Sequence, residues 1–123
     1  MAKKILVVDD EEAIVMMVSS RLNNEGYETV SASDGESAVK AAQTEAPDLI
    51  ICDVMMPPPN GFQVCRIVKD DPKTKHIPII LLTAKATESD KFWGSESGAD
   101  TYVTKPYNPE ELLQKVKELL ETE

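Results

Sequence analysis

The chain has 123 residues, of which 41% are hydrophobic and 28% are charged, a size and composition typical of one soluble globular domain. Its 22 acidic and 13 basic residues give a formal charge of -9, which disfavours nucleic acid as a direct partner. All apolar runs are much shorter than the roughly 18 residues of a membrane span. We therefore expect a single cytoplasmic domain over residues 1–123, with no membrane segment.

Five short segments have the composition of β-strands. Residues 5–8, 49–52 and 79–82 are continuous apolar runs, as expected of parallel strands that are covered on both faces. Residues 29–32 and 101–103 are more polar, which is typical of strands at the edges of a sheet.

Helical patterns alternate with these strands. The first helix is expected to stop at Gly26, and its inward face is marked by residues at helical spacing, namely Ile14, Met17, Val18, Arg21 and Leu22. The second helix follows Gly35 and is marked by small or apolar residues, namely Ala38, Val39, Ala41 and Ala42.

Three further helices are expected after the third, fourth and fifth strands. Phe62, Cys65 and Val68 mark the third helix, and residues 88–97 form a fourth that Gly94 weakens. The last helix has the clearest start, with Asn108 as N-cap and Pro109 at the first position.

The strict alternation of strand and helix predicts a (βα)5 fold. Such a chain forms a three-layer α/β/α sandwich around a parallel sheet. Placing the two polar strands at the edges favours the flavodoxin-like order 2-1-3-4-5. The crevice for a ligand is then expected between the carboxyl ends of strands 1 and 3, where the strand order reverses.

The cysteines and the histidine indicate no soft-metal site. Cys52 and Cys65 lie in apolar stretches, which favours reduced, buried packing residues. His76 is the only histidine and lies in a polar loop, so neither a His-rich metal site nor Cys-His catalysis is expected.

Polar groups of different chemical kinds follow four of the five strands. Asp9 and Asp10 follow the first strand, Asp53 the third, Thr83 the fourth and Lys105 the fifth. Each has a structural explanation by itself, such as helix capping or a solvated surface charge. Because parallel strands end at one edge of the sheet, however, the five side chains are expected to converge, and their joint placement favours a functional site.

Carboxylates brought together repel one another unless a cation is present, and Mg2+ prefers oxygen ligands. We expect Asp10 and Asp53 to bind Mg2+ directly, Asp9 to bind it directly or through water, and the backbone carbonyl of Met55 to complete the protein ligands. Lys105 and Thr83 then supply a positive charge and a hydroxyl donor for phosphoryl oxygens. This set of groups indicates phosphoryl transfer to an aspartate.

The motifs at the strand ends resemble those of response-regulator receiver domains, the CheY-like family of two-component signal transduction. The segments that carry the resemblance are Val7-Val8-Asp9-Asp10-Glu11, Asp53-Val54-Met55-Met56-Pro57 with Gly61 beyond, Leu82-Thr83-Ala84, and Gly98-Ala99-Asp100-Thr101-Tyr102-Val103-Thr104-Lys105-Pro106. They occur in the family's order and spacing, and they cover essentially the whole chain.

This resemblance implies a signalling switch that catalyses its own phosphorylation and its own slow dephosphorylation. Asp53 would accept a phosphoryl group from a phosphohistidine of a sensor histidine kinase or phosphotransfer protein. Asp9, Asp10 and the carbonyl of Met55 would bind Mg2+, with Mn2+ as a substitute, while Lys105 and Thr83 would contact the phosphoryl group.

The resemblance also implies how the signal leaves the site. Thr83 would move toward the phosphoryl group and Tyr102 would turn inward, which changes the face formed by helix 4, strand 5 and helix 5. That face would contact a partner or an output domain, and whether phosphorylation drives dimerisation stays open. The family's cis peptide bond would fall between Lys105 and Pro106.

Three features are particular to this chain. The loop 57–61 is richer in proline than is usual in the family, which should stiffen it. Met55 and Lys85 occupy positions that tune the lifetime of the phosphoryl group in the family. Trp93 is expected to be partly exposed on the side of the fourth helix, where it either contacts a partner or packs between helices 3 and 4.

Two other classes of function fit the same fold less well. An aspartate-nucleophile phosphatase needs a carboxylic acid two residues after the nucleophile to protonate the leaving group, and this chain has Met55 there. An FMN-binding flavodoxin-like carrier needs a phosphate-binding loop after strand 1, where residues 9–12 are all acidic.

Overall fold

The predicted sheet and strand order are confirmed. The computed structural model describes residues 2–83, 98–104 and 108–121. Its five strands are β1 (Lys4–Val8), β2 (Glu28–Ala32), β3 (Leu49–Asp53), β4 (Ile79–Thr83) and β5 (Thr101–Thr104). All neighbouring strands are parallel, in the order β2-β1-β3-β4-β5, so the two polar strands lie at the edges.

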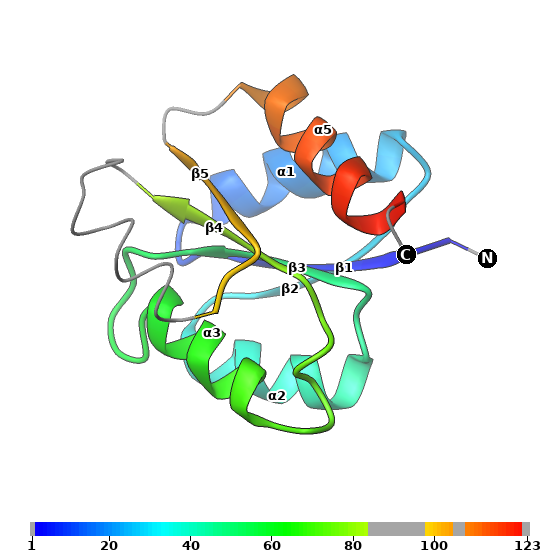
Figure 1. Cartoon of the computed structure of the whole chain (residues 1–123). Helices are drawn as coiled ribbons and strands as arrows, with labels where there is room; N and C mark the ends of the chain where they lie inside the picture. Colours follow the sequence, from blue (N-terminus) through cyan, green and yellow to red (C-terminus); the bar gives the residue numbers. More distant parts are fainter. Residues whose placement is uncertain (1, 84–97, 105–107, 122–123) are drawn as a thin grey trace.

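Four helices of the described residues cover the two faces of the sheet. They are α1 (Glu12–Asn24), α2 (Gly35–Glu45), α3 (Gly61–Asp70) and α5 (Pro109–Glu121). Figure 1 shows α1 and α5 together on one face and α2 and α3 on the other, which gives the predicted three layers. The helix expected over residues 88–97 lies outside the described residues, as does Trp93. No helix in the described part of the chain is both long and apolar enough to span a bilayer.

Alternation along the strands divides the core into two clusters. Along β1, Leu6 and Val8 face the α2 and α3 side, whereas Ile5 and Val7 face the α1 and α5 side. The central strands repeat this alternation, because successive side chains of a strand point to opposite faces. Both faces are covered, which explains why the central strands are continuous apolar runs.

Local sequence signals place the helix ends. Asp34 caps α2 by accepting a hydrogen bond from the Ser37 backbone N–H at 2.7 Å, and this bond holds the pKa of Asp34 below its usual range. The predicted N-cap Asn108 accepts from the Glu110 backbone N–H at 2.8 Å. Gly26, with φ +92, follows the end of α1 as predicted.

The predicted inward face of α1 is wrong at Met17 and at Arg21, whose side chain is exposed. Val18 and Leu22 are buried, and Ile14 and Val15 pack against the same core cluster. Met17, in contrast, is 45% exposed. At 100° per residue the buried stripe passes through Ile14, Val18 and Leu22, and Met17 lies at its margin.

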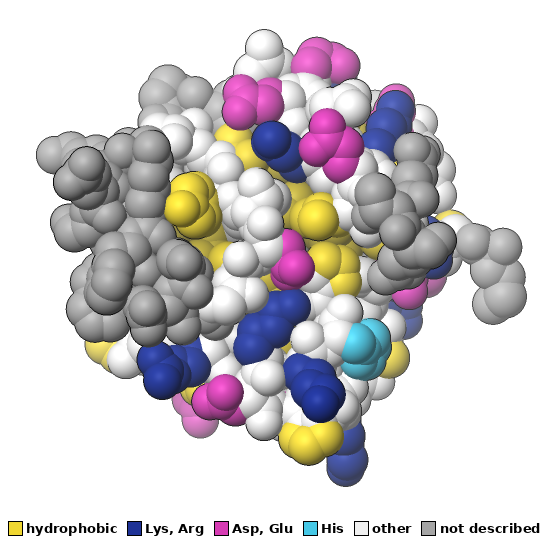
Figure 2. Space-filling model, in the orientation of Figure 1, with side chains coloured by type: hydrophobic (Ala, Val, Ile, Leu, Met, Phe, Trp, Pro, Cys, Tyr) yellow, Lys and Arg dark blue, Asp and Glu magenta, His cyan; other side chains and the backbone are white. Residues whose placement is uncertain are grey.

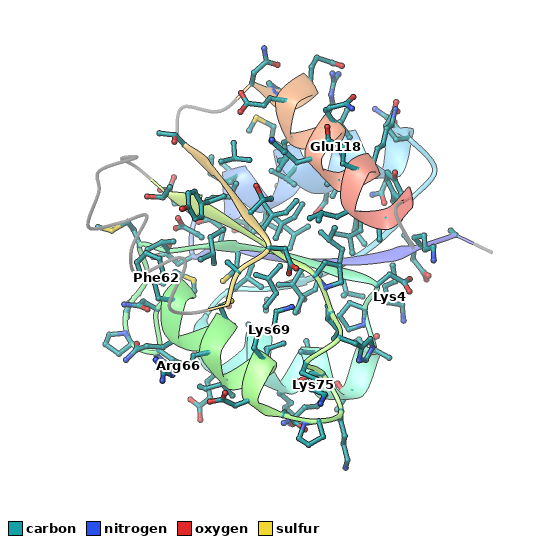
Figure 3. The ribbon with its side chains drawn as sticks, in the orientation of Figure 1. Lys4, Phe62, Arg66, Lys69, Lys75 and Glu118 are labelled. Carbon is teal, nitrogen blue, oxygen red and sulfur yellow. The ribbon has the colours of Figure 1, made fainter. Side chains whose placement is uncertain are left out.

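An ion pair at the amino ends of the strands explains the Asp100 of the Gly98-Ala99-Asp100 motif. Lys69 projects from α3 toward the sheet (Figure 3), and its Nζ donates to Asp100 Oδ2 at 3.1 Å and to the Ile77 carbonyl at 2.7 Å. The same Asp100 oxygen accepts from the Ile79 backbone N–H at 2.8 Å. Asp100 therefore ties the start of β5 to α3 and to the start of β4.

We expect Asp100→Ala to lower the free energy of unfolding by about 1–3 kcal/mol, because it leaves the Ile79 N–H and the Lys69 ammonium without this acceptor. Urea unfolding measures the change. The control is Asp70→Ala, which removes the same charge from an exposed position on α3 and is expected to change stability by no more than about 0.5 kcal/mol. Equal stability of the two variants would contradict this role of Asp100.

Candidate functional site

Three carboxylates meet at the carboxyl edge of the sheet. Because β1 and β3 pair in parallel, with Val8 opposite Cys52, the next residues, Asp9 and Asp53, lie side by side. Each of Asp9, Asp10 and Asp53 offers a carboxylate oxygen, and these three oxygens lie within 4.8 Å of one another. Asp9 and Asp53 are buried, with exposed fractions of 1% and 2%, whereas Asp10 is exposed.

Backbone contacts fix the two buried carboxylates. Asp9 Oδ1 accepts from the Glu11 backbone N–H at 2.9 Å, and Asp53 Oδ1 accepts from the Met55 backbone N–H at 3.4 Å. Beyond Asp53 the Val54 backbone N–H donates to the Leu82 carbonyl at 2.9 Å. The carboxylates are therefore held by the ends of three adjacent central strands, which leaves little freedom for them to separate.

This donor set fits a hard divalent cation. Mg2+ prefers oxygen ligands and keeps several waters, and the three carboxylates of this cluster offer oxygen ligands only, one of them on an exposed residue. Negative charges held this close repel one another, so a bound cation would stabilise the cluster. Asp9, Asp10 and Asp53 are the residues that could hold it.

Charge is distributed unevenly around the fold. The acidic run 9–12 and Asp53 occupy the carboxyl edge of the sheet. On the face shown in Figure 2, basic side chains gather over α3 and the loop after it, where Figure 3 labels Arg66, Lys69 and Lys75. That loop leads into the amino end of β4, at the end of the sheet opposite the carboxylates. The four adjacent acidic residues 9–12 and Asp53 favour cation binding at the carboxylates.

The other predicted site residues lie on β4, on β5 and after β5. Thr83 is 6% exposed and is the last residue of β4, one position beyond the Leu82 that pairs with Asp53. Its hydroxyl therefore belongs to the same edge of the sheet. Lys105 and the Lys105–Pro106 bond lie outside the described residues; within the described part, the cis peptide bond joins Pro58 and Pro59.

Tyr102 lies in β5 opposite Leu81 of β4. It is half-buried and packs against the core cluster on the α2 and α3 side. This is the half-buried position that its place in an edge strand predicts.

The residue before Asp53 is not a candidate nucleophile. Burial raises the pKa of Cys52, and the nearby Asp53, Cys65 and Asp9 raise it further. The thiol is therefore protonated at neutral pH, and its Sγ donates to the Asp53 carbonyl at 3.4 Å. Both cysteines are buried, as predicted.

Two glycines make close backbone approaches near the site that the sequence did not predict. A Cβ on Gly61 would lie 2.4 Å from the Asp53 carbonyl oxygen, and a Cβ on Gly35 would lie 2.1 Å from the Pro59 carbonyl oxygen. Both are the first residues of their helices. A glycine at a helix start is usually explained by local conformation, so no signal in the sequence points to these long-range contacts.

Comparisons with known proteins identify the class. A family model described as the response regulator receiver domain matches residues 5–117. The chain therefore belongs to the response regulator receiver domain family.

Among curated relatives, the chain is 50% identical over 120 residues to the alkaline phosphatase synthesis transcriptional regulatory protein PhoP of Bacillus subtilis, covering 98% of this chain and 49% of the relative. It is 46% identical to the response regulator PleD of Caulobacter vibrioides, covering 97% of this chain and 26% of the relative. The chain thus spans about half the length of one relative and a quarter of the other.

Solved structures agree with this assignment. A putative response regulator from Chloroflexus aurantiacus superposes with a TM-score of 0.92 at 38% identity, covering 98% of both chains. The chemotaxis protein CheY4 of Vibrio cholerae gives a TM-score of 0.92 at 38% identity, covering 98% of this chain and 100% of that chain. These likenesses extend over the whole described fold.

We expect Mg2+ to raise the melting temperature of the wild-type domain and Asp10→Asn to lose most of that rise. Asp10→Asn should melt at or above the wild-type temperature without metal, because it removes one of three crowded negative charges. A ligand at about 100 times its Kd stabilises a protein by about 2.7 kcal/mol, so thermal melts with and without Mg2+ resolve the effect. Asp70→Asn serves as the control and should keep the full rise. An unchanged Mg2+ response in Asp10→Asn would remove Asp10 from the metal site.

Proposed function

We propose that this receiver domain, residues 1–123, is a phosphorylation-activated signalling switch in which Asp53 accepts the phosphoryl group. The observation that carries the proposal is the position of Asp53, a buried carboxylate at the end of a central strand and within 4.8 Å of two others. A carboxylate beside a cation site is suited to phosphoryl transfer.

Asp9, Asp10 and Asp53, with the backbone carbonyl of Met55, are proposed to hold Mg2+, for which Mn2+ can substitute. When bound, the ion supplies positive charge that offsets the repulsion between the carboxylates and the incoming phosphoryl oxygens. The cluster of carboxylate oxygens supports the assignment of the three aspartates.

The proposed reaction is an in-line transfer from a phosphohistidine. A carboxylate oxygen of Asp53 forms a bond to phosphorus while the phosphorus–nitrogen bond of the donor breaks, and the imidazole that leaves takes up a proton. Thr83 lies at the same edge as Asp53 and is proposed to donate its hydroxyl to a phosphoryl oxygen. Lys105 is proposed to supply a fixed positive charge to the same group.

Thr83 and Tyr102 are proposed to couple phosphorylation to the surface. The phosphoryl group adds about -1.5 to -2 charges and three strong acceptors, which draw the Thr83 hydroxyl inward and leave space that the Tyr102 ring fills. The two residues lie on adjacent paired strands, so a movement of Thr83 is proposed to alter the position of Tyr102. The face proposed to respond is that of helix 4, β5 and α5, of which β5 and α5 lie in the described residues.

Membership of the receiver family is the basis for the proposed partners. A sensor histidine kinase or a phosphotransfer protein is proposed as the phosphoryl donor in the cytoplasm, and a protein partner or output domain as the receiver of the signal. PhoP is by name a transcriptional regulatory protein of about twice this length. Where this domain controls transcription, we propose that a different domain contacts DNA, because the charge of -9 opposes a direct contact.

Neither alternative class has support from the site. A phosphatase would need a proton donor two residues after Asp53, where the exposed side chain of Met55 offers a thioether. A flavodoxin-like carrier would need to bind phosphate beside Asp9 and Asp10, which repel it. The family assignment also points away from both.

Acetyl phosphate and Mg2+ test the proposal without the kinase. We expect intact-mass measurement to show one added phosphoryl group on the wild type and on Asp70→Ala, and none on Asp53→Ala or after Mg2+ is chelated. An adduct that survives in Asp53→Ala, or a wild type that forms no adduct, would refute Asp53 as the acceptor.

A further inference from the structure

The loop between β3 and α3, residues 54–60, carries the Met55 carbonyl, and the hydrogen bonds that it makes within the described part of the chain lie at Val54, Met55, Met56 and Asn60. At its start the Val54 carbonyl accepts from the backbone N–H groups of Met56 at 3.0 Å and Gly61 at 3.2 Å. At its end Asn60 forms a capping box with Gln63. Both ends of the loop are therefore tied to α3.

The middle of this loop consists of three prolines. Proline has no backbone N–H, so Pro57, Pro58 and Pro59 cannot donate any hydrogen bond that would hold the loop in place. Pro57 and Pro58 are exposed, whereas Pro59 is half-buried. Met56, directly before the prolines, is buried in the core cluster, so this stretch is placed by Met56 at one end and by the packing of Pro59 at the other.

Pro59 packs against the first residue of another helix. Gly35 begins α2 and is buried, and a Cβ placed on it would lie 2.1 Å from the Pro59 carbonyl oxygen and 2.7 Å from Pro59 Cγ. Contacts shorter than 3.0 Å are essentially never made by a real Cβ. Only glycine admits the loop at this distance, because any larger residue would push either the loop or the start of α2 away.

We propose that Gly35 is a positioning residue of the metal site. By admitting Pro59 against α2, it sets the place of the loop that carries the Met55 carbonyl and that joins directly to Asp53. This inference rests on the proposed function, since it assigns Gly35 a role in the same Mg2+ and phosphoryl site. Gly35 touches neither the ion nor the phosphoryl group; it acts through Pro59.

The neighbouring geometry favours a role at the site over simple packing. Gly61, at the start of α3, makes the same kind of close approach to the Asp53 backbone. The helix after the loop, α3, and the helix before β3, α2, therefore both pack against the segment that holds the acceptor. Ser33 and Ser37, on either side of Gly35, line a hollow together with Asp9 and Asp10. A shift at the start of α2 would therefore act on the carboxylates both through the loop that contains Pro59 and through this hollow.

The test compares Mg2+ affinity with stability in matched glycine variants. We expect Gly35→Ala to raise the Mg2+ Kd, measured by calorimetry, about 10- to 100-fold, as is typical when support of a metal ligand is lost. The control is Gly26→Ala, which has open space within 4 Å but a φ of +92. It should lower the melting temperature, because alanine is strained at this φ. It should leave the Mg2+ Kd at the wild-type value, because Gly26 precedes β2, at the end of the sheet opposite the carboxylates.

Pro59→Ala provides a second route if Gly35→Ala folds poorly. It removes the Cγ contact without adding an atom to α2 and is expected to raise the Mg2+ Kd by a smaller factor. In the double variant the two effects should not multiply, because both act through one contact. A wild-type Mg2+ Kd in Gly35→Ala or in Pro59→Ala, or full multiplication in the double variant, would overturn the inference. Wild-type protein that binds no Mg2+ would instead overturn the proposed function itself.

Discussion

The crowding of three carboxylates at one edge of the sheet is the constraint on which the other features depend. Parallel pairing of β1 with β3 forces Asp9 and Asp53 together, and the turn after β1 adds Asp10. In a folded domain without a cation this arrangement costs free energy, because like charges repel at short distance. A divalent cation would relieve this repulsion, and we propose that the cluster binds one together with an anionic phosphoryl group.

Much of this arrangement can be predicted from the sequence. The apolar runs of the central strands and the polar runs of the edge strands favour the order 2-1-3-4-5, and this order brings the carboxyl ends of β1, β3 and β4 to one place. The positions of Asp9, Asp10, Asp53 and Thr83 at that edge follow from topology, without knowledge of any side-chain contact. The N-cap Asn108 is likewise a local signal, and it is found where it was predicted.

The contacts that sequence reasoning missed join elements that are distant along the chain. Gly35 meets Pro59 from another helix, and Lys69 of α3 meets Asp100 before β5. Neither residue type predicts such a contact, since glycine and lysine are both common at helix ends. The exposed Met17 is a different case, because an apolar residue at helical spacing can lie at the margin of the buried stripe without entering the core.

Locating the phosphorylated residue tests the central claim most directly. An acyl phosphate is reduced by borohydride to an alcohol, so treatment after incubation with Mg2+ and acetyl phosphate converts the phosphorylated aspartate to homoserine. Peptide mass spectrometry then identifies the position. We expect the conversion at Asp53 and at neither Asp9 nor Asp10, with none in the absence of Mg2+. Conversion at Asp9 or Asp10, or conversion at Asp53 that does not depend on Mg2+, would contradict the account.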